Sequence, residues 1–364
     1  MSFVNKVVLI TGASAGIGAT TAELFAKEGA SVSIVGRNES KLNAVAQKCK
    51  KLGAKTLAIK ADVSKDQDAD LIVKKTVDEF GKLDVLVNNA GILRQIGIMD
   101  DDFLESFDDV MNTNLRGPVR ITRSAVPSLI KTKGNIVNVS SIAGTSVNRP
   151  AFSAYKTSKA ALNHFTRCAA LEFAPHGIRV NSISPGPVRT EIFDGLQEQF
   201  VNALLEKTAL HRISDTEEIA DIILFVASDK AKSITGSNYI IDNETKGNVV
   251  NVSSIASTSI VANGFMPYCV SKAGLDHFTR GAARELASSG VRVNSVNPGP
   301  VITDMAVNSG IADSLPDLDK MVTPALGRAS DADEISDLIM YLASDKARSV
   351  TGSCFVIDNG MLLK

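Results

Sequence analysis

The chain has 364 residues, which is long for one domain and short for two complete α/β domains. Its formal net charge is −1 with acidic and basic residues interspersed, and no apolar run approaches the roughly 20 residues that span a bilayer, so neither nucleic acid nor a membrane is an expected partner. Strand-like sequence already begins at Lys6, and the four cysteines lack metal-ligand spacing, so we expect a cytoplasmic protein with reduced thiols, no signal peptide and no metal site.

Short apolar runs alternate with helical patterns along residues 1–243. Seven runs predict strands, at residues 6–11, 31–35, 56–59, 83–87, 135–139, 178–183 and 238–241. They are apolar on successive residues, as in a parallel sheet that is covered on both faces. Helical patterns lie between them, at residues 19–29, 41–53 and 65–81 and from about Tyr155 and Thr216. This alternation predicts an α/β fold with a doubly wound parallel sheet.

A glycine-rich loop follows the first predicted strand and opens the first helix. Gly12 allows a tight turn, Gly16 lets the backbone approach a pyrophosphate, and Gly18 lets the helix pack on the strand. The start of the helix supplies free amides and a positive dipole end for the phosphate. The strand–loop–helix context therefore predicts a nucleotide site rather than a structural turn.

The end of the second predicted strand bears on the choice of nucleotide. An acidic residue there would bind a ribose 2′-hydroxyl, but this chain has Gly36 followed by Arg37. A guanidinium can hold the 2′-phosphate of NADP and stack on adenine, so Arg37 favours NADP; the alternative is a solvated surface arginine. Asp62 and Val63 follow the third strand and can contact the adenine ring, with helix entry as the alternative role for Asp62.

Tyr155 and Lys159 are four residues apart and therefore project from one face of a predicted helix. A free tyrosine has a pKa of about 10, so acting near pH 7 requires a fall of about 3 units. A nearby ammonium favours the phenolate and shifts the pKa in that direction. Such a tyrosine can exchange a proton with a carbonyl or alcohol while a nicotinamide moves hydride.

With these motifs in order, residues 1–243 resemble the short-chain dehydrogenase/reductase family. The matching segments are Thr11-Gly12-Ala-Ser-Ala-Gly16-Ile17-Gly18, Asp62-Val63, Asn88-Asn89-Ala90-Gly91, Asn114-Leu115, Ser140-Ser141, Tyr155-Lys-Thr-Ser-Lys159 and Pro185-Gly186. The resemblance implies a seven-stranded Rossmann fold and an NAD(P)-dependent oxidoreductase that acts on a carbonyl/alcohol pair.

The resemblance also implies a role for individual residues. Ser141 would orient the substrate oxygen, and it is preferred to Ser140 because Ile142-Ala-Gly144 follows it. Tyr155 would be the acid/base, Lys159 would hold the ribose and tune Tyr155, and Asn114 would hold a relay water. The implied cofactor-binding residues are Gly12, Ser14, Gly16, Ile17, Gly18, Arg37, Asp62, Val63, Asn89, Tyr155, Lys159 and Val188.

The back half of this unit occurs twice. Tyr268 and Lys272 lie 113 residues after the first pair, and the same shift carries residues 134–141 onto 247–254 and Pro185-Gly186 onto Pro298-Gly299. The sequence thus predicts a complete domain at 1–243 and, at 244–364, a second domain in which residues 245–364 duplicate the C-terminal half. The duplicate lacks counterparts of the glycine loop, Arg37, Asp62, Asn89 and Asn114, so Tyr268 is not expected to have its own cofactor site.

Two arrangements are open for this duplicate. It is an appended half-domain, or it replaces the first back half within the sheet; loop closure and folding during synthesis favour the first. An appended copy would leave its first strand, at residues 248–252, without its usual neighbour. Members of the family usually form homo-oligomers through these helices and the last strand, so we expect the copy to dock on residues 1–243 by mimicking a partner subunit.

The leading hypothesis is an NADP-dependent oxidoreductase that acts on a small-molecule carbonyl or secondary alcohol. The alternatives are an NAD-dependent alcohol dehydrogenase and a catalytically silent nucleotide-binding scaffold that the appended half blocks. The intact set of Asn114, Ser141, Tyr155 and Lys159 argues against loss of chemistry. Residues 190–213 would form a lid, and their mixture of apolar and charged residues does not identify a substrate.

Overall fold

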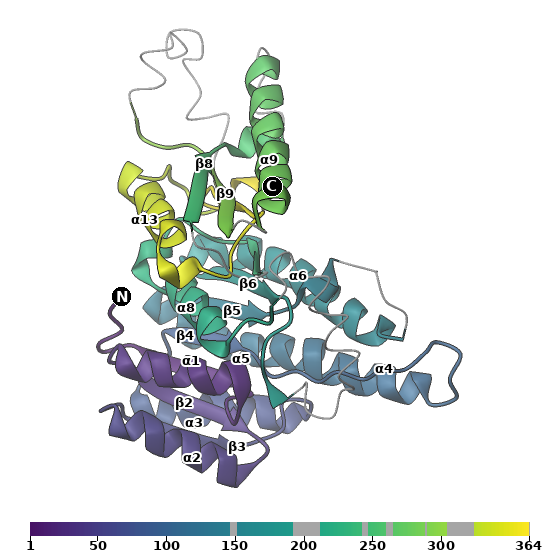
Figure 1. Cartoon of the computed structure of the whole chain (residues 1–364). Coiled ribbons are helices and arrows are strands. Elements are labelled where there is room, and N and C mark those ends of the chain that lie inside the picture. Colours follow the sequence, from purple (N-terminus) through teal and green to yellow (C-terminus); the bar gives the residue numbers. More distant parts are fainter. Residues whose placement is uncertain are drawn as a thin grey trace.

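The computed structural model describes residues 1–145, 151–191, 212–241, 247–259, 265–287, 290–303 and 324–363. Within these residues the chain forms two parallel sheets (Figure 1). The main sheet has seven strands in the order β3-β2-β1-β4-β5-β6-β7, and the second sheet has three in the order β10-β9-β8. We call residues 1–241 the first unit and residues 247–363 the second unit.

The strands of the main sheet are the apolar runs that the sequence predicts. They are β1 (Val7–Thr11), β2 (Ser31–Gly36), β3 (Thr56–Lys60), β4 (Val85–Asn88), β5 (Asn135–Val139), β6 (Arg179–Pro185) and β7 (Asn238–Ile241). All neighbouring pairs are parallel. The doubly wound Rossmann fold predicted from the sequence is therefore confirmed. The strand order reverses between β1 and β4, which is where such sheets bind ligands.

Helices cover both faces of the main sheet, and each face has its own apolar core. One core contains residues of α1 (Gly16–Lys27), α2 (Glu39–Lys51) and α8 (Thr216–Ala227). The other contains residues of α3 (Asp66–Phe80), α5 (Gly117–Thr132) and α6 (Ser153–Phe173). This double cover explains why β1, β4, β5 and β6 are buried at every position.

The second unit contains the second sheet and two longer helices. Its elements are β8 (Gly247–Val252), α9 (Met266–Leu286), β9 (Val291–Pro298), α13 (Ala332–Ala343) and β10 (Cys354–Ile357). In the described residues β8 is an edge strand that pairs with β9 alone. Val249 and Val252 of β8 are 42% and 49% exposed, whereas β5, whose sequence β8 repeats, is buried throughout.

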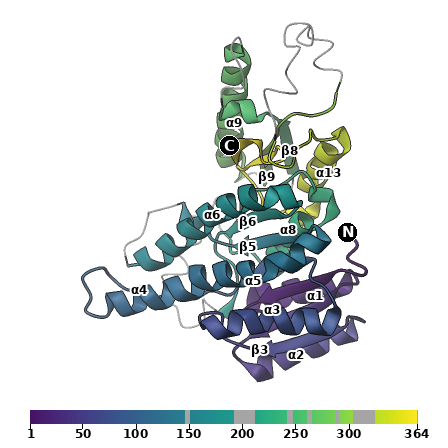
Figure 2. The ribbon, with the colours of Figure 1, turned by 180° about the vertical axis from the view of Figure 1, so that it is seen from behind.

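The second unit packs against α8 of the first unit (Figures 1 and 2). It also contacts β7, where Phe355 stacks on Tyr239 and the Ser353 hydroxyl donates to the carbonyl of Ile240. We call the contact surface between the two units the seam. The apolar core that contains α1, α2 and α8 continues across the seam and includes Tyr341 and Phe355. The main sheet is completed by β5, β6 and β7 of the first unit, and β8, β9 and β10 lie outside it. Among the described residues, no helix combines the length and apolar composition that crossing a bilayer requires.

Candidate active site

The glycine-rich loop joins β1 to α1 in a conformation that leaves no room for larger residues. Gly12 has a φ of +65°, and a Cβ at this position would lie 2.7 Å from the Cα of Ala90. A Cβ on Gly18 would lie 2.4 Å from the carbonyl oxygen of Gly12. No side chain caps the start of α1, and its first turn carries no acidic residue. The loop and helix start thus present backbone amides that suit a phosphate.

Asn89 ties this loop to the end of β4. Its Nδ2 donates to the carbonyl oxygens of Thr11 and Gly12, at 3.0 and 3.1 Å. The hydroxyl of Thr11 in turn accepts the amides of Asn89 and Ala90, at 3.0 and 3.1 Å. These bonds hold the ends of β1 and β4 together at the point where the strand order reverses.

The residues predicted at the adenosine end follow β2 and β3. Gly36 packs on Ser14 of the loop, and the next residue, Arg37, has an exposed side chain. Asp62 accepts both the amide and the hydroxyl of Ser64, at 3.0 and 2.8 Å, so its carboxylate shapes the entry to α3. Val63 is buried. The structure thus shows a helix-entry role for Asp62, and contact with an adenine stays a prediction.

Tyr155 and Ser141 come together where α6 crosses the end of β5. The Ser141 hydroxyl lies near enough to the Tyr155 phenol to lower the pKa of Tyr155 as a hydrogen-bonding neighbour. Ser141 begins the short helix η2 (Ile142–Gly144), and its oxygen accepts the amide of Ala143 at 3.2 Å. The neighbouring Ser140 instead donates to the carbonyl of Lys159 at 3.1 Å. Ser141 is therefore the serine that faces Tyr155.

Lys159 lies one helical turn after Tyr155, and only 4% of the residue is exposed. Its Nζ donates to the carbonyl of Val139 at 2.9 Å. Burial lowers the pKa of Lys159 from 10.5 to about 8, because the charged form loses its hydration.

The pKa of Tyr155 moves in the opposite direction to the sequence-based prediction. Burial raises it above 10, and the hydrogen bond with Ser141 only partly opposes that rise. The expectation that Lys159 lowers the pKa of Tyr155 was therefore wrong for this structure. Desolvation of the phenolate outweighs any attraction from the ammonium.

Asn114 lies in a π-helical turn, η1 (Asn112–Arg116), between α4 (Phe103–Met111) and α5. Its side chain is fully buried and bonds both backbone groups of Ile92, accepting the amide at 2.8 Å and donating to the carbonyl at 2.9 Å. Its Nδ2 also donates to Ser158 at 3.1 Å. π-Helical turns often occur at functional sites, and this one directs the Asn114 amide toward α6.

Gly91 connects the glycine loop with the Tyr155 cluster. A Cβ on Gly91 would lie 3.3 Å from Oδ1 of Asn114 and 3.5 Å from Nζ of Lys159. Its neighbour Ala90 lies against Gly12. The structure therefore brings the loop, Asn89, Asn114, Ser141, Tyr155 and Lys159 together at the carboxyl ends of β1, β4 and β5.

Other predicted positions border this cluster. Val188 is buried and bridges to Ser214, and a Cβ on Gly16 would lie 3.0 Å from Cγ2 of Thr190. The segment after β6 thus reaches the glycine loop. Most of the predicted lid, residues 192–211, lies outside the described residues.

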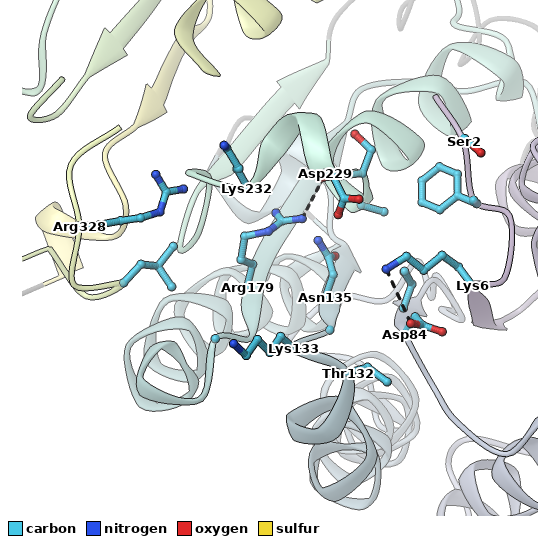
Figure 3. A pocket seen from close by; sticks show the side chains of 17 residues that line it. Ser2, Lys6, Asp84, Thr132, Lys133, Asn135, Arg179, Asp229, Lys232 and Arg328 are labelled. Carbon is cyan, nitrogen blue, oxygen red and sulfur yellow. Dashed lines mark hydrogen bonds and ion pairs between the residues drawn. The ribbon is translucent and has the colours of Figure 1, made fainter. Parts of the chain in front are cut away.

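A cavity of about 330 Å³ lies at the opposite end of the main-sheet strands, where the strands begin. Figure 3 shows Lys6, Asp84, Asn135 and Arg179 around it, with Arg328 reaching in from the second unit. Burial lowers the pKa of Arg179 to about 10, and its guanidinium bonds backbone carbonyls. The cavity is lined by groups that stabilise the sheet edge and has no residue of the Tyr155 cluster.

The second Tyr–Lys pair repeats the local geometry of the first. Nζ of Lys272 donates to the carbonyl of Val252 at 2.9 Å and lies 5.5 Å from the centroid of the Tyr268 ring. Ser254 likewise accepts the amide of Ala256 at 3.2 Å. In the described residues of the second unit, no glycine-rich loop accompanies this pair.

A family model described as Enoyl-(Acyl carrier protein) reductase matches residues 12–243 and again residues 243–362. The chain belongs to the short-chain dehydrogenase/reductase family. An uncharacterized oxidoreductase of Thermotoga maritima is 41% identical over 252 residues, which are 66% of this chain and 98% of that relative. The 3-oxoacyl-[acyl-carrier-protein] reductase FabG of Staphylococcus epidermidis is 37% identical over 240 residues, 65% of this chain and 98% of the relative.

Solved structures of the short-chain dehydrogenase/reductase family match the same share of the chain. An enzyme of this type from Mycobacterium marinum is 36% identical with a TM-score of 0.63, covering 66% of this chain and 95% of its own. A 7α-hydroxysteroid dehydrogenase, solved with NADH and 7-oxo glycochenodeoxycholic acid, is 28% identical with a TM-score of 0.64, covering 66% and 94%. The chain is accordingly an oxidoreductase that acts on CH–OH or C=O groups with NAD(P).

Ser158, Gly91 and Thr11 support the site but are not among the individual site residues that the sequence predicts. Ser158 donates to the carbonyl of Tyr155 at 2.7 Å and receives the bond from Asn114, so it positions both. Ser158 lies between the two functional residues of the segment Tyr155-Lys-Thr-Ser-Lys159. A polar residue on the buried side of this helical turn is the feature of the sequence that could have predicted its role. Gly91 could have been found from the close approach that a glycine permits.

Proposed function

We propose that the chain is an NADP-dependent oxidoreductase that interconverts a carbonyl and a secondary alcohol, with residues 1–243 as its complete catalytic domain. The observation that supports this most is the Tyr155 ring with the Lys159 ammonium 5.7 Å from its centroid and the Ser141 hydroxyl as a neighbour, joined through Gly91 to the glycine loop. This arrangement puts a proton donor next to a phosphate-binding loop, which is what hydride transfer to a carbonyl requires.

The residues present fit a dinucleotide. Side chains at Gly12 or Gly18 would fill the loop, and the uncapped start of α1 offers amides for the pyrophosphate. A bound nicotinamide supplies or accepts the hydride. Gly12, Ser14, Gly16, Ile17, Gly18 and Asn89 would form the pyrophosphate side of this site, Asp62 and Val63 would line the adenine, and Val188 would border the nicotinamide.

Each residue of the catalytic cluster has a task that its surroundings support. Tyr155 stays protonated at neutral pH because burial raises its pKa, so it can donate a proton to a carbonyl oxygen. Ser141 is a hydrogen-bonding neighbour of Tyr155 and would orient the same oxygen. Lys159 keeps a positive charge below about pH 8 and holds the ribose. Asn114 would hold a relay water near Lys159.

The preference for NADP rests on the end of β2. Gly36 removes the side chain that would bind a ribose 2′-hydroxyl, and Arg37 places an exposed guanidinium beside it. A charge-assisted hydrogen bond is worth roughly 1.5–3 kcal/mol, which corresponds to a preference of about ten- to a hundredfold. Two of the similar structures were solved with NADH or NAD+, which makes NAD the alternative that must be measured.

We propose further that residues 244–364 form a second domain, a partial duplicate of the C-terminal half without a catalytic role. Tyr268 and Lys272 keep the geometry of the first pair, but the described residues around them offer no phosphate loop and no counterpart of Asn114. Without a hydride donor beside it, Tyr268 has no proton transfer to complete.

The test is oxidation of NADPH and NADH with a panel of ketones and 3-oxoacyl thioesters, the latter included because similar reductases carry that name. We expect Tyr155→Phe to abolish turnover and Tyr268→Phe, its matched control, to leave turnover unchanged. Loss of activity in Tyr268→Phe alone would assign catalysis to the second copy. No turnover by the wild type with any member of the panel, despite nucleotide binding, would favour the silent scaffold.

A further inference from the structure

The cavity at the beginning of the main-sheet strands is lined by charged residues from both units (Figure 3). Its volume of about 330 Å³ is within the usual range for small-ligand sites. The first unit forms most of its wall, and Leu326 and Arg328 of the second unit complete it. The Tyr155 cluster lies at the other end of the strands, so the cavity is separate from the proposed site of hydride transfer.

Positive charge predominates around the cavity. Five of the residues that line it are cations: Lys6, Lys133, Arg179, Lys232 and Arg328. Two are carboxylates: Asp84 and Asp229. Three further charged residues form ion pairs with this set: Lys82, Asp331 and Glu334. Six cations thus face four carboxylates, and the net charge of +2 would be balanced by a dianion.

The ion pairs leave some of these cations without a close carboxylate. Asp84 is paired with Lys82 at 3.0 Å, and Lys6 lies farther from it, at 3.8 Å. In the part of the chain that the structure describes, no carboxylate lies within 4.0 Å of the Lys133 ammonium or the Arg179 guanidinium. The uncompensated charge is therefore concentrated on the first unit's side of the cavity.

Arg179 is the buried cation of this group, with 9% of the residue exposed. Its guanidinium donates to the carbonyl oxygens of Val226, Ser228 and Ile234 at 3.0 to 3.2 Å. These dipoles satisfy N–H groups but do not neutralise a full charge, and burial lowers the pKa of Arg179 to about 10. Burying a cation without a carboxylate partner is unfavourable, and a bound anion would offset that penalty.

Lys133 ends α5 in a left-handed backbone conformation with a φ of +48°. Glycine or asparagine adopts this conformation more readily, because other side chains crowd the backbone there. The stem of Lys133 lies beside Gly177, where an added Cβ would be 3.4 Å from its Cγ. Asn5, next to Lys6, also has a positive φ, of +62°. Strained residues of this kind gather at functional sites, so the strain points to a role for these ammonium groups.

The placement of the cations favours one shape of anion. They come from separate segments: the residues before β1, the turn between α5 and β5, β6, the residues after α8, and the second unit. A tetrahedral phosphate offers acceptor oxygens in all these directions, whereas a carboxylate offers them in one plane. Lysine binds phosphate as a point charge. A phosphate monoester carries a charge of about −1.5 to −2 near neutral pH, which matches the net charge around the cavity.

We propose that this cavity binds a small phosphate-bearing dianion that contacts both units. Free phosphate and a phosphate monoester share the chemistry that the cavity recognises. Lys6, Lys133 and Arg179 hold the dianion from the first unit. Arg328 reaches it from the second unit, so the bound phosphate stabilises the docked position of that unit.

The test is calorimetric titration of the full chain with inorganic phosphate at constant ionic strength, after saturation with NADP+. The nucleotide fills the glycine loop, which would otherwise compete for phosphate. We expect one phosphate to bind per chain. Lys133→Gly and Lys6→Gln should each weaken this binding about tenfold or more, because each removes a charge-assisted hydrogen bond.

Lys133→Gly separates loss of the charge from loss of the fold. Glycine is favoured in the left-handed conformation, so this variant should keep or raise the Tm of the wild type. The matched control is Lys131→Ala, which removes an exposed lysine of α5 that does not line the cavity and should leave phosphate binding unchanged. No saturable binding by the wild type, or equal affinity in the wild type and Lys133→Gly, overturns the proposal.

Hydrogen exchange measured on the NADP+-saturated chain locates the phosphate. We expect added phosphate to slow exchange at residues 131–135 and 326–330, which border the cavity, and to leave residues 12–18 unchanged. Protection confined to residues 12–18 would place the phosphate on the glycine loop and refute the proposed site.

Glycerol 3-phosphate and malonate identify the chemical class of the ligand. Tighter binding of glycerol 3-phosphate than of inorganic phosphate would identify a phosphate monoester as the ligand, and weaker binding would identify free phosphate. Malonate carries two carboxylates and should bind more weakly than either. If malonate binds as tightly as both phosphates, the cavity does not recognise phosphate and the proposal fails.

Discussion

Nζ of Lys159 lies 5.7 Å from the centroid of the Tyr155 ring and donates its hydrogen bond to the carbonyl of Val139 at 2.9 Å. The ammonium is thus held close to the phenol but directed at the backbone. Burial acts on both groups in the direction that favours their neutral forms, raising the pKa of Tyr155 and lowering that of Lys159. The proton donor of the site is therefore stable at neutral pH, and the lysine is the group that titrates near it.

The first prediction concerns the pH dependence of carbonyl reduction. Tyr155 remains an acid throughout the neutral range because its pKa is raised. Lys159, with a pKa of about 8, loses its charge above that pH. We expect kcat/KM for the reduction to fall about tenfold per pH unit above about pH 8, since this parameter reports ionisations of the free enzyme. A profile that stays level to pH 10 would contradict the assignment, and circular dichroism across the range checks that the fold persists.

The second prediction is that Lys159→Met stabilises the protein while abolishing activity. The unfolded lysine binds its proton with a pKa near 10.5 and the folded one with a pKa of about 8, so burying the charge costs stability. At about 1.4 kcal/mol per pKa unit, less about 1 kcal/mol for the lost bond to Val139, the variant should be more stable by about 2.5 kcal/mol at pH 7.

The pH dependence of that gain follows from proton linkage. Below pH 8 both states of the wild type are protonated and the cost is fully present. Between pH 8 and 10.5 the unfolded state binds more protons, so wild-type stability rises with pH and the advantage of Lys159→Met shrinks. Urea unfolding at pH 7 and pH 10 measures this difference. A variant less stable than the wild type at pH 7 would show that the ammonium is stabilised by its surroundings.

The sequence predicted those helices and strands whose structure depends mainly on their own residues. All seven strands of the main sheet appear at the expected apolar runs, with ends that move by two residues or fewer. The helix starts were less accurate: α1 begins at Gly16, three residues before the predicted start. The residues before that start belong to a loop whose conformation is set by contacts with Ala90, far along the chain.

The sequence predicted which residues form the site, but it did not predict how burial shifts their pKa values. The family pattern named Ser141, Tyr155 and Lys159, which the structure brings together. The direction of the pKa shift of Tyr155 was missed because burial depends on the three-dimensional surroundings, whereas the Tyr–Lys spacing shows only the attraction. The packing of the second unit against α8 was predicted only in outline. The sequences of α8 and α13 each predict an ordinary buried helix, and only the structure shows that these helices contact each other.

The third prediction tests the cofactor preference at Arg37. Arg37→Ala should lower kcat/KM for NADPH about ten- to a hundredfold, because it removes a charge-assisted bond to the 2′-phosphate. The value for NADH should change little. Arg123→Ala, which alters an exposed arginine on α5, is the matched control and should affect neither. If Arg37→Ala lowers kcat/KM equally for NADPH and NADH, the guanidinium contacts the adenine or stabilises the fold and does not bind the 2′-phosphate.

The fourth prediction uses two glycines with different surroundings. A Cβ on Gly18 would come within 2.4 Å of the Gly12 carbonyl oxygen, so Gly18→Ala must displace the loop and should weaken nucleotide binding at least tenfold. Gly274 lies within α9 with no atom within 4 Å of the Cβ position, so Gly274→Ala should leave binding unchanged and stabilise the chain by about 0.5–1 kcal/mol. Calorimetric titration with NADPH distinguishes them, and unchanged binding in Gly18→Ala would place the phosphates elsewhere.

The fifth prediction is that Phe225 and Tyr341 contribute to stability as a pair. Each substitution to alanine should cost about 3–5 kcal/mol, because each ring is buried at the seam. The double variant should cost less than the sum, by about 0.5–1.5 kcal/mol for the stack, because the first substitution already removes that contact. Urea unfolding of the four proteins of this double-mutant cycle measures the difference.

The control for this cycle pairs Phe225 with Leu129, which lies in the core on the opposite face of the main sheet. Phe225→Ala and Leu129→Ala share no contacts, so their effects should add. Additive effects for Phe225 and Tyr341 as well would mean that the rings do not touch in solution. In that case α8 and α13 would not hold the two units together, whatever the remaining polar contacts contribute.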